Sequence, residues 1–230
     1  MKTQPLSLVL LGALLLPVLA FRFGGWAIVS VDDLPEYLVA GKPVAVSFMV
    51  RQHAVTLLDG LKPTITLKSG STEMTIPASW ANERGRYAAT ITAPHAGEWT
   101  IKIHSGFMNL ERTLLPMHVV AAGAPAPRAL ADAERGHQLF VAKDCVSCHT
   151  RGGEGTAGYK FGPDLTGKRY VADYVAKFLA DPQSSPLSRN TAATPNSVRM
   201  PNLNLKEREI ASLVAFLNSE GPVLGSTTPR

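Results

Sequence analysis

The chain has 230 residues, of which 45% are hydrophobic and 18% charged, a composition typical of a globular protein and not of a disordered one. Its formal net charge is +5, from 23 basic and 18 acidic residues. These charges are spread along the chain without a run of Lys and Arg, so the sequence predicts no nucleic-acid binding.

The first twenty residues are predicted to be an export signal. Lys2 provides the positive start, and Leu6–Ala20 forms an apolar run of about 15 residues, shorter than the roughly 20 of a spanning helix. Cleavage is expected before Phe21, and a retained anchor is the alternative. The folded part is therefore expected in the periplasm or on the extracytoplasmic face of the membrane. Any membrane contact would be peripheral or made through an uncleaved N-terminus.

Residues 21–120 have the pattern of an all-β domain. Short segments rich in Val, Ile and Thr alternate with turn signals such as "AGKP", "NERG" and "PHAGE", which favours an antiparallel sandwich with an immunoglobulin-like fold. Strands are expected in "WAIVSV", "VAVSFMV", "TITLKS", "RYAATITA", "WTIKIHS" and "LLPMHVV". The expected core residues are Trp26, Phe48, Val50, Ile65, Ile76, Tyr87, Ile91, Trp99, Ile101 and Ile103.

After this domain the pattern becomes helical. Residues 121–128, rich in Ala, Gly and Pro, are expected to form a short linker. Residues 129–222 then form a predicted all-α domain, and residues 223–230 a tail. Helices are expected in "ADAERGHQLFVAKDC", "YVADYVAKFLADP" and "LNLKEREIASLVAFLNSEG", the last with Asn204 as a possible N-cap and Gly221 past its end.

Both cysteines lie in "CVSCH", residues 145–149. A thioredoxin-type redox pair would follow a strand of an α/β fold, and a zinc site would need further Cys or His ligands downstream, where there are none. A disulfide between residues three apart would close only a tiny loop. Covalent haem attachment uses Cys145, Cys148 and His149 together, because two thiols one turn apart can add to the two vinyl groups of a porphyrin while the imidazole binds the iron.

The second axial ligand is predicted by elimination. Met200 is the only one of six methionines after the attachment site, and no histidine follows His149. Met200 as an ordinary core residue is the alternative interpretation. His137 is a rival ligand, although we expect its side chain to point to solvent.

With these residues in view, residues 128–221 resemble a class I cytochrome c domain. The resemblance rests on "GHQLFVAKDCVSCHT", "FGPDLTGKRY" and "RMPNLNLKEREIASLVAFL". It implies one covalent haem c, a crossing of the first and last helices at Gly136 and Phe140, and a Pro163 carbonyl that accepts a hydrogen bond from the axial His149.

The first half resembles, more weakly, the YtkA-like or FixH-like immunoglobulin-type domains, on "LPEYLVAGKPVAVSFMVRQHAVTLLDGLKPTI". This resemblance implies a fold type and no chemistry. The soft or imidazole side chains of this half are candidate copper ligands, although ordinary sheet residues are the expected interpretation. They are His53, His95, His104, Met108, Met117 and His118.

The predicted function is one-electron transfer, without a catalytic residue or turnover of its own. The sandwich is expected to dock the carrier to a redox partner protein, such as a membrane-bound respiratory complex. A haem-based gas or redox sensor, or a copper-handling protein with an accessory cytochrome, are the alternatives.

Overall fold

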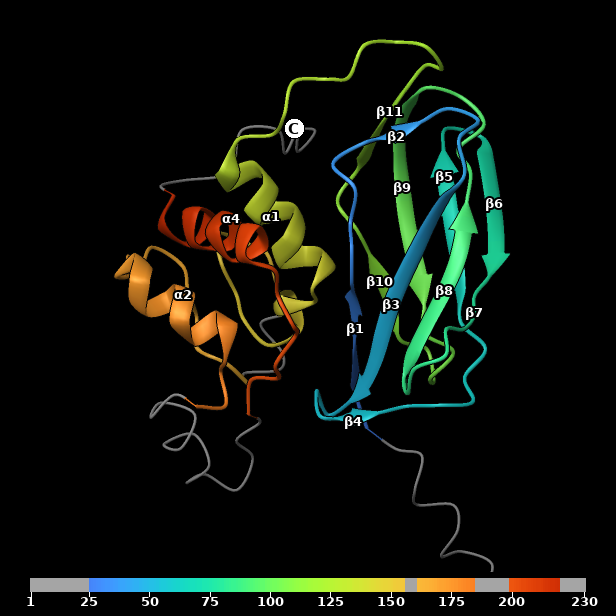
Figure 1. The fold of residues 1–230 in the computed structure, drawn as a ribbon. Helices are drawn as coiled ribbons and strands as arrows, with labels where there is room; N and C mark the ends of the chain where they lie inside the picture. Colours follow the sequence, from blue (N-terminus) through green and yellow to red (C-terminus); the bar gives the residue numbers. More distant parts are fainter. Residues whose placement is uncertain (1–24, 156–160, 185–198, 220–230) are drawn as a thin grey trace, which may run out of the picture.

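The computed structural model describes residues 25–155, 161–184 and 199–219. It has two parts, a β-sandwich and a cluster of helices, which lie side by side (Figure 1). The predicted signal (1–20), the tail (223–230) and Gly221 lie outside the described residues. No helix in the described ranges is long and apolar enough to cross a membrane.

The sandwich consists of two sheets. One has the strand order β1-β3-β8-β7, with β4 paired to β3, and all its pairings are antiparallel. Its strands are β1 (Ala27–Val31), β3 (Val44–Gln52), β4 (Thr56–Leu57), β7 (Ser79–Trp80) and β8 (Arg86–Ile91).

The second sheet has the order β2-β11-β9-β5-β6, with β10 paired to β9. Only the pairing of β2 with β11 is parallel among the described strands of this sheet. Its strands are β2 (Leu38–Val39), β5 (Thr64–Ser69), β6 (Thr72–Pro77), β9 (Gly97–His104), β10 (Glu111–Thr113) and β11 (Met117–Val120).

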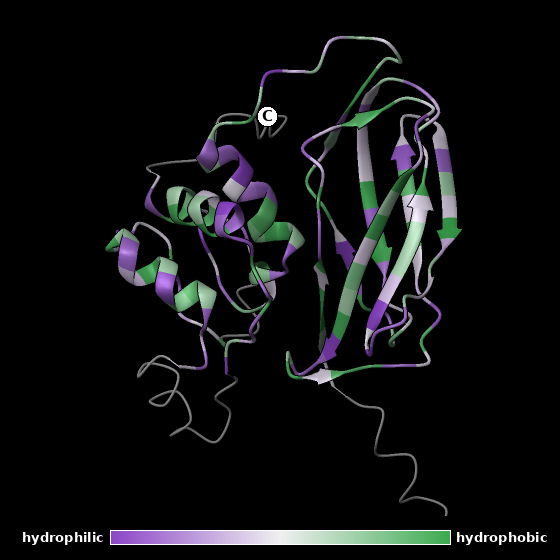
Figure 2. Ribbon diagram, in the orientation of Figure 1, coloured by the Kyte–Doolittle hydropathy of each residue, from purple (hydrophilic) through white to green (hydrophobic). Residues whose placement is uncertain are grey.

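The sandwich core follows from alternation along the strands. In β9, Trp99, Ile101 and Ile103 are buried, while the residues between them are partly exposed. Figure 2 shows the corresponding hydrophobic stretches on β3 and β9. Most of the predicted core is confirmed, with Ile76 packed at its margin. Trp26 was wrongly assigned to it: its ring stacks on Phe161 of the helical part, with centroids 4.4 Å apart.

The helical part contains α1 (Asp132–Ala142), the 3-10 turn η2 (Cys145–Ser147), α2 (Ala172–Ala180) and α4 (Glu207–Asn218). Each of the helices α1 and α4 has a glutamate in its first turn, Glu134 or Glu209, that accepts a hydrogen bond from the backbone N–H three residues earlier. The predicted N-cap at Asn204 was wrong. The capping residue is Lys206, and Asn204 has a left-handed backbone (φ 51°) in the loop before the helix.

Helices α1 and α4 cross at Gly136. A Cβ at this position would lie 2.0 Å from the carbonyl oxygen of Ser212 and 2.6 Å from Cβ of Phe216, so only glycine permits this approach. Phe140 packs on Phe216 with ring centroids 5.4 Å apart. This crossing agrees with the contact that the sequence resemblance implied, and it sets one wall of the site described next.

Candidate haem site

The two cysteines lie in a tight turn that directly follows α1. Asp144, the residue before η2, has a left-handed backbone (φ 62°), and η2 starts at Cys145. The backbone N–H groups of Cys148 and His149 both donate to the Cys145 carbonyl, at 3.1 and 2.8 Å. This turn brings both thiols, which are not joined in a disulfide, to one wall of a cavity.

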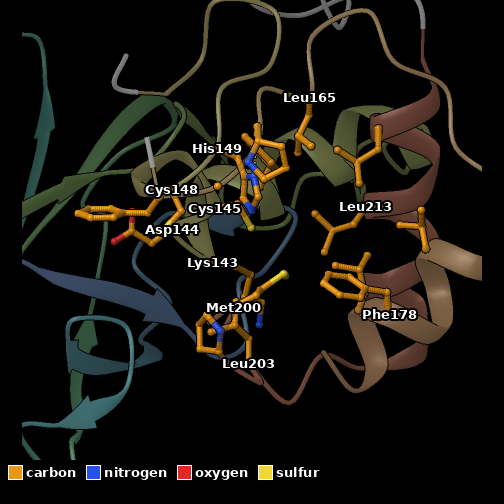
Figure 3. A pocket seen from close by; sticks show the side chains of 18 of the residues that line it. Lys143, Asp144, Cys145, Cys148, His149, Leu165, Phe178, Met200, Leu203 and Leu213 are labelled. Carbon is orange, nitrogen blue, oxygen red and sulfur yellow. Dashed lines mark hydrogen bonds between the residues drawn. The ribbon is translucent and has the colours of Figure 1, made fainter. Parts of the chain in front are cut away.

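The cavity has a volume of about 590 Å³, within the roughly 300–1,000 Å³ of typical ligand and cofactor sites. Figure 3 shows His149 and Met200 on opposite sides of the opening, the cysteines on a third side and Leu213 and Phe178 facing them. Most of the lining is apolar. It includes Phe140, Leu165, Val175, Phe178, Leu179, Leu203, Leu213 and Leu217.

The His149 ring is held by the loop opposite the turn. Its Nδ1 lies 3.0 Å from the carbonyl oxygen of Pro163, which can only accept, so Nδ1 carries the hydrogen and Nε2 is free to bind a metal. Burial lowers the pKa of His149, against the raising effect of this hydrogen bond. The imidazole is therefore neutral near pH 7, the form that ligates iron.

The space for this ring depends on Gly162, whose backbone passes directly over it. A Cβ on Gly162 would lie 2.4 Å from Cε1 and 2.6 Å from Nδ1 of His149. The Gly162 N–H also donates to the Cys148 carbonyl at 3.0 Å. This bond connects the Gly162 loop to the turn at residues 145–149, which we call the attachment turn.

Met200 lies in the loop before α4 and packs against the hydrophobic core of the helical part. Its carbonyl accepts a hydrogen bond from the side chain of Gln183 at 3.1 Å. Met200 thus lines the cavity from the side that His149 does not occupy (Figure 3). A thioether sulfur there can act as a weak axial ligand.

The thiols do not have the properties of a reactive redox pair. Burial, with a smaller contribution from Asp144, raises the pKa of Cys145 to about 12 and that of Cys148 to about 11. Reactive thiols have lowered pKa values, so this site disfavours thiol–disulfide exchange. Neutral thiols against an apolar cavity with a histidine ligand fit an attached porphyrin.

His137 is not exposed to solvent, contrary to the expectation from sequence. It is 6% exposed and stacks on Phe216, with ring centroids 5.0 Å apart, while Nε2 lies 3.2 Å from the carboxylate of Glu154. It is absent from the cavity lining. Its ring is part of the α1–α4 packing.

The candidate copper ligands of the sandwich are dispersed. His118 pairs with Glu98, His104 with Glu111, and His95 stacks on Trp99. Met117 is buried in the core, whereas Met108 is 65% exposed. In the described ranges no three His, Cys, Asp or Glu side chains are gathered so that they could hold a metal ion.

The sequence did not indicate the neighbours that the sandwich supplies to this site. Ile28 of β1 lines the cavity, and Phe161, under Trp26, lines it as well. Asp144 is buried next to the turn and pairs with Arg112 of β10 at 2.5 Å. Burial raises the pKa of Asp144 to about 6, despite the opposing effect of Arg112. Contacts between residues so far apart in sequence have no local signature.

Comparison with known proteins identifies the helical part. Residues 133–220 match the family model "Cytochrome c", so the C-terminal half is a cytochrome c domain. Such a domain carries covalently bound haem c, one for a single domain, and the cavity and its donors fit this group.

Other comparisons add little. No curated protein matches the chain. A solved polysaccharide lyase has 17% identity and a TM-score of 0.26, covering 50% of this chain and 14% of that chain. Superoxide reductase (neelaredoxin) from Ignicoccus hospitalis has 9% identity and a TM-score of 0.26, covering 44% of this chain and 85% of that chain. At these TM-scores neither similarity bears on fold or function.

Proposed function

We propose that the protein is an exported one-electron carrier whose haem is attached through Cys145 and Cys148, with His149 and Met200 as axial ligands. One observation carries the proposal. The imidazole and the thioether face each other across a cavity of about 590 Å³ whose third side holds both thiols.

The haem iron supplies the chemistry, a change of one electron between its ferric and ferrous states. His149 and Met200 would hold the iron from both sides, which would leave no open position for a substrate. Pro163 fixes the tautomer and orientation of His149, and a Met/His pair raises the reduction potential relative to other axial pairs. The apolar lining keeps water from the iron.

Location and partners complete the proposal. The apolar run at residues 6–20 supports export. Export would place the protein outside the cytoplasm, where c-type haem attachment is expected to take place. The partner is proposed to be another redox protein, belonging to a membrane-bound respiratory complex. The outer faces of the sandwich, including Trp80, which is 58% exposed on the edge strand β7, are proposed to contribute to docking. A Trp80→Ser variant with undiminished electron delivery to membranes would argue against this docking face.

The proposal is tested by absorption spectra of the exported protein, oxidised and reduced, for wild type and Met200→Ala. We expect reduced c-type bands that survive acid-acetone extraction. The weak far-red band of a methionine-ligated ferric haem should be present in the wild type and lost in Met200→Ala. Met74→Ala, in the sandwich sheet, is the matched control and should keep that band.

Three outcomes would overturn parts of the proposal. A protein without colour, made where haem attachment is competent, would exclude a cytochrome. Covalent haem without the far-red band in the wild type would exclude Met200 as the ligand. Carbon monoxide binding to the reduced wild type at neutral pH would favour a gas sensor over a carrier.

A further inference from the structure

The sandwich is bonded directly to the haem attachment turn. Arg112 of β10 donates to the Asp144 carboxylate at 2.5 Å and to Ser147 Oγ at 2.7 Å. The backbone N–H of Val29 in β1 donates to the other carboxylate oxygen of Asp144 at 2.8 Å. The Lys143 ammonium donates to the Asp32 carbonyl. Three residues next to or between the cysteines are therefore held by the sandwich.

These contacts are buried. Lys143 is 3% exposed and the Asp144 side chain 0% exposed, while the Arg112 side chain is 19% exposed. Removing one partner of a buried charge pair leaves the other charge unpaired in the interior, which is strongly destabilising. Arg135 adds hydrogen bonds to the Leu34 and Pro35 carbonyls. An interface of this kind fixes the two parts relative to each other, although the linker at 121–128 has no regular structure.

The same face of the sandwich contributes surface to the cavity. Ile28, 2% exposed, is one of its lining residues, as are Cys145 and Cys148. Trp26 lies flat on Phe161, with an interplanar angle of 19°, and so backs a second lining residue from outside. The sandwich therefore contributes Ile28 to the lining directly and supports Phe161 through Trp26.

We propose that the β1 and β10 face of the sandwich is a fixed wall of the haem pocket, which holds the attachment turn in place and excludes water from the cysteine-side edge of the haem. This inference rests on the proposed function, since it concerns the haem that the site would carry. A drier surrounding disfavours the additional positive charge of ferric iron, so the wall raises the reduction potential. Arg112 and Ile28 are positioning residues in this scheme.

Two sets of measurements test the wall. In the first, the reduction potential is compared between wild type and two variants. Ile28→Ala opens the wall without a change of charge, and the double variant Arg112→Met/Asp144→Asn removes the ion pair and the Arg112 hydrogen bond to Ser147 while keeping the net charge balanced. Both should have a lower potential with the His/Met spectrum retained. Arg84→Met, which breaks an exposed sandwich pair with Asp59 at 3.2 Å, should keep the wild-type potential.

The second measurement needs no redox readout. A protease site placed in the exposed linker at residues 121–126 allows the purified holoprotein to be cut between its two parts. The wild-type halves should co-elute in gel filtration after cleavage, whereas those of Arg112→Met/Asp144→Asn should separate on dilution.

The outcomes distinguish this inference from the proposed function. Wild-type halves that separate at once, or an unchanged potential in both wall variants, would overturn the wall while leaving the carrier intact. A wild-type protein without covalent haem would instead overturn the proposed function itself.

Discussion

At the scale of single residues, the missing side chain of Gly162 is what leaves room for the imidazole of His149. The glycine has no left-handed backbone, so its requirement is one of space alone. Its N–H also links the Pro163 loop to the attachment turn. The orientation of His149, the proposed axial ligand, is thus set by a backbone segment packed against its ring.

We therefore expect Gly162→Ala to displace the imidazole. The new Cβ would lie within 3 Å of three ring atoms, so the ring or the Pro163 carbonyl must move and the hydrogen bond at Nδ1 must lengthen. The reduced spectrum should show partial loss of the low-spin form, with a lower potential. Gly167→Ala is the control: no described residue lies within 4 Å of the new Cβ, and although the φ of +65° strains an alanine, the spectrum should not change. Identical spectra for both variants would refute this role of Gly162.

Asp144 predicts a pH dependence of stability. Its carboxyl has an ordinary pKa of 3.8 and a folded-state pKa of about 6, raised by burial. Between these values the folded protein holds a proton that the unfolded chain has lost. Stability associated with Asp144 is therefore full at low pH and falls as pH rises from about 4 to about 6, by about 3 kcal/mol in total.

The measurement is the free energy of unfolding of wild type minus that of Asp144→Asn, followed over this pH range by denaturant titration. Taking this difference cancels the contributions of the other carboxylates to the pH dependence, because they titrate in both proteins. A difference that is constant, or that rises with pH, would mean that Arg112 and Val29 outweigh the burial of the carboxylate.

At the scale of elements, the crossing of α1 and α4 is the main packing contact of the cytochrome domain. Leu139, Phe140 and Leu213 are buried around it, and Phe140 and Leu213 also line the cavity. The crossing therefore positions both the start of the attachment turn and the wall opposite the cysteines.

We expect Gly136→Ala to lower the free energy of unfolding by about 3 kcal/mol, the upper part of the range for overpacked cores, because its Cβ would meet backbone atoms of α4. Thermal unfolding of the holoprotein measures the effect. Gly123→Ala, in the exposed linker with no atom of the described ranges within 4 Å, should cost only about 1 kcal/mol for its φ of +79°. A Gly136→Ala protein as stable as Gly123→Ala would mean that the helices can move apart freely.

Local signals predicted these elements well and their connections poorly. The strands and helices follow alternation and helical periodicity, and the attachment turn follows a five-residue motif. Asn204 was misjudged as an N-cap because an Asn before a helical pattern is a common capping signal. In the structure the Lys206 N–H donates to the Glu209 carboxylate instead. Trp26 and His137 were misjudged because burial of an aromatic side chain depends on which distant element covers it.

At the scale of the whole molecule, the cavity mouth combines positive charge with exposed apolar surface. Lys168 and Arg199 line the cavity and are exposed, and Tyr174, 47% exposed, lines it as well. Since the sandwich covers the cysteine side, electron exchange is expected at this mouth.

A charge reversal of the mouth, Lys168→Glu with Arg199→Glu, should slow oxidation of the reduced protein by ferricyanide, a small anion, about tenfold at low salt. The difference should shrink toward 1 M salt, where the screening length is about 3 Å. Stopped-flow absorbance measures the rate. Lys68→Glu with Arg84→Glu makes the same change of charge on exposed sandwich positions and should have a much smaller effect. Equal slowing by both pairs of substitutions would indicate that the oxidation rate depends on the net charge of the protein and not on charges at the cavity mouth.

The position of β1 at the edge of its sheet has a further consequence, for solubility. All five of its residues are buried, although among the described strands only β3 pairs with it. The cytochrome domain covers the other side, and Asp144 takes the Val29 N–H that a foreign strand would otherwise bond. The electron-transfer domain thus protects its neighbour from edge-to-edge self-association, and a sandwich produced alone should aggregate through β1.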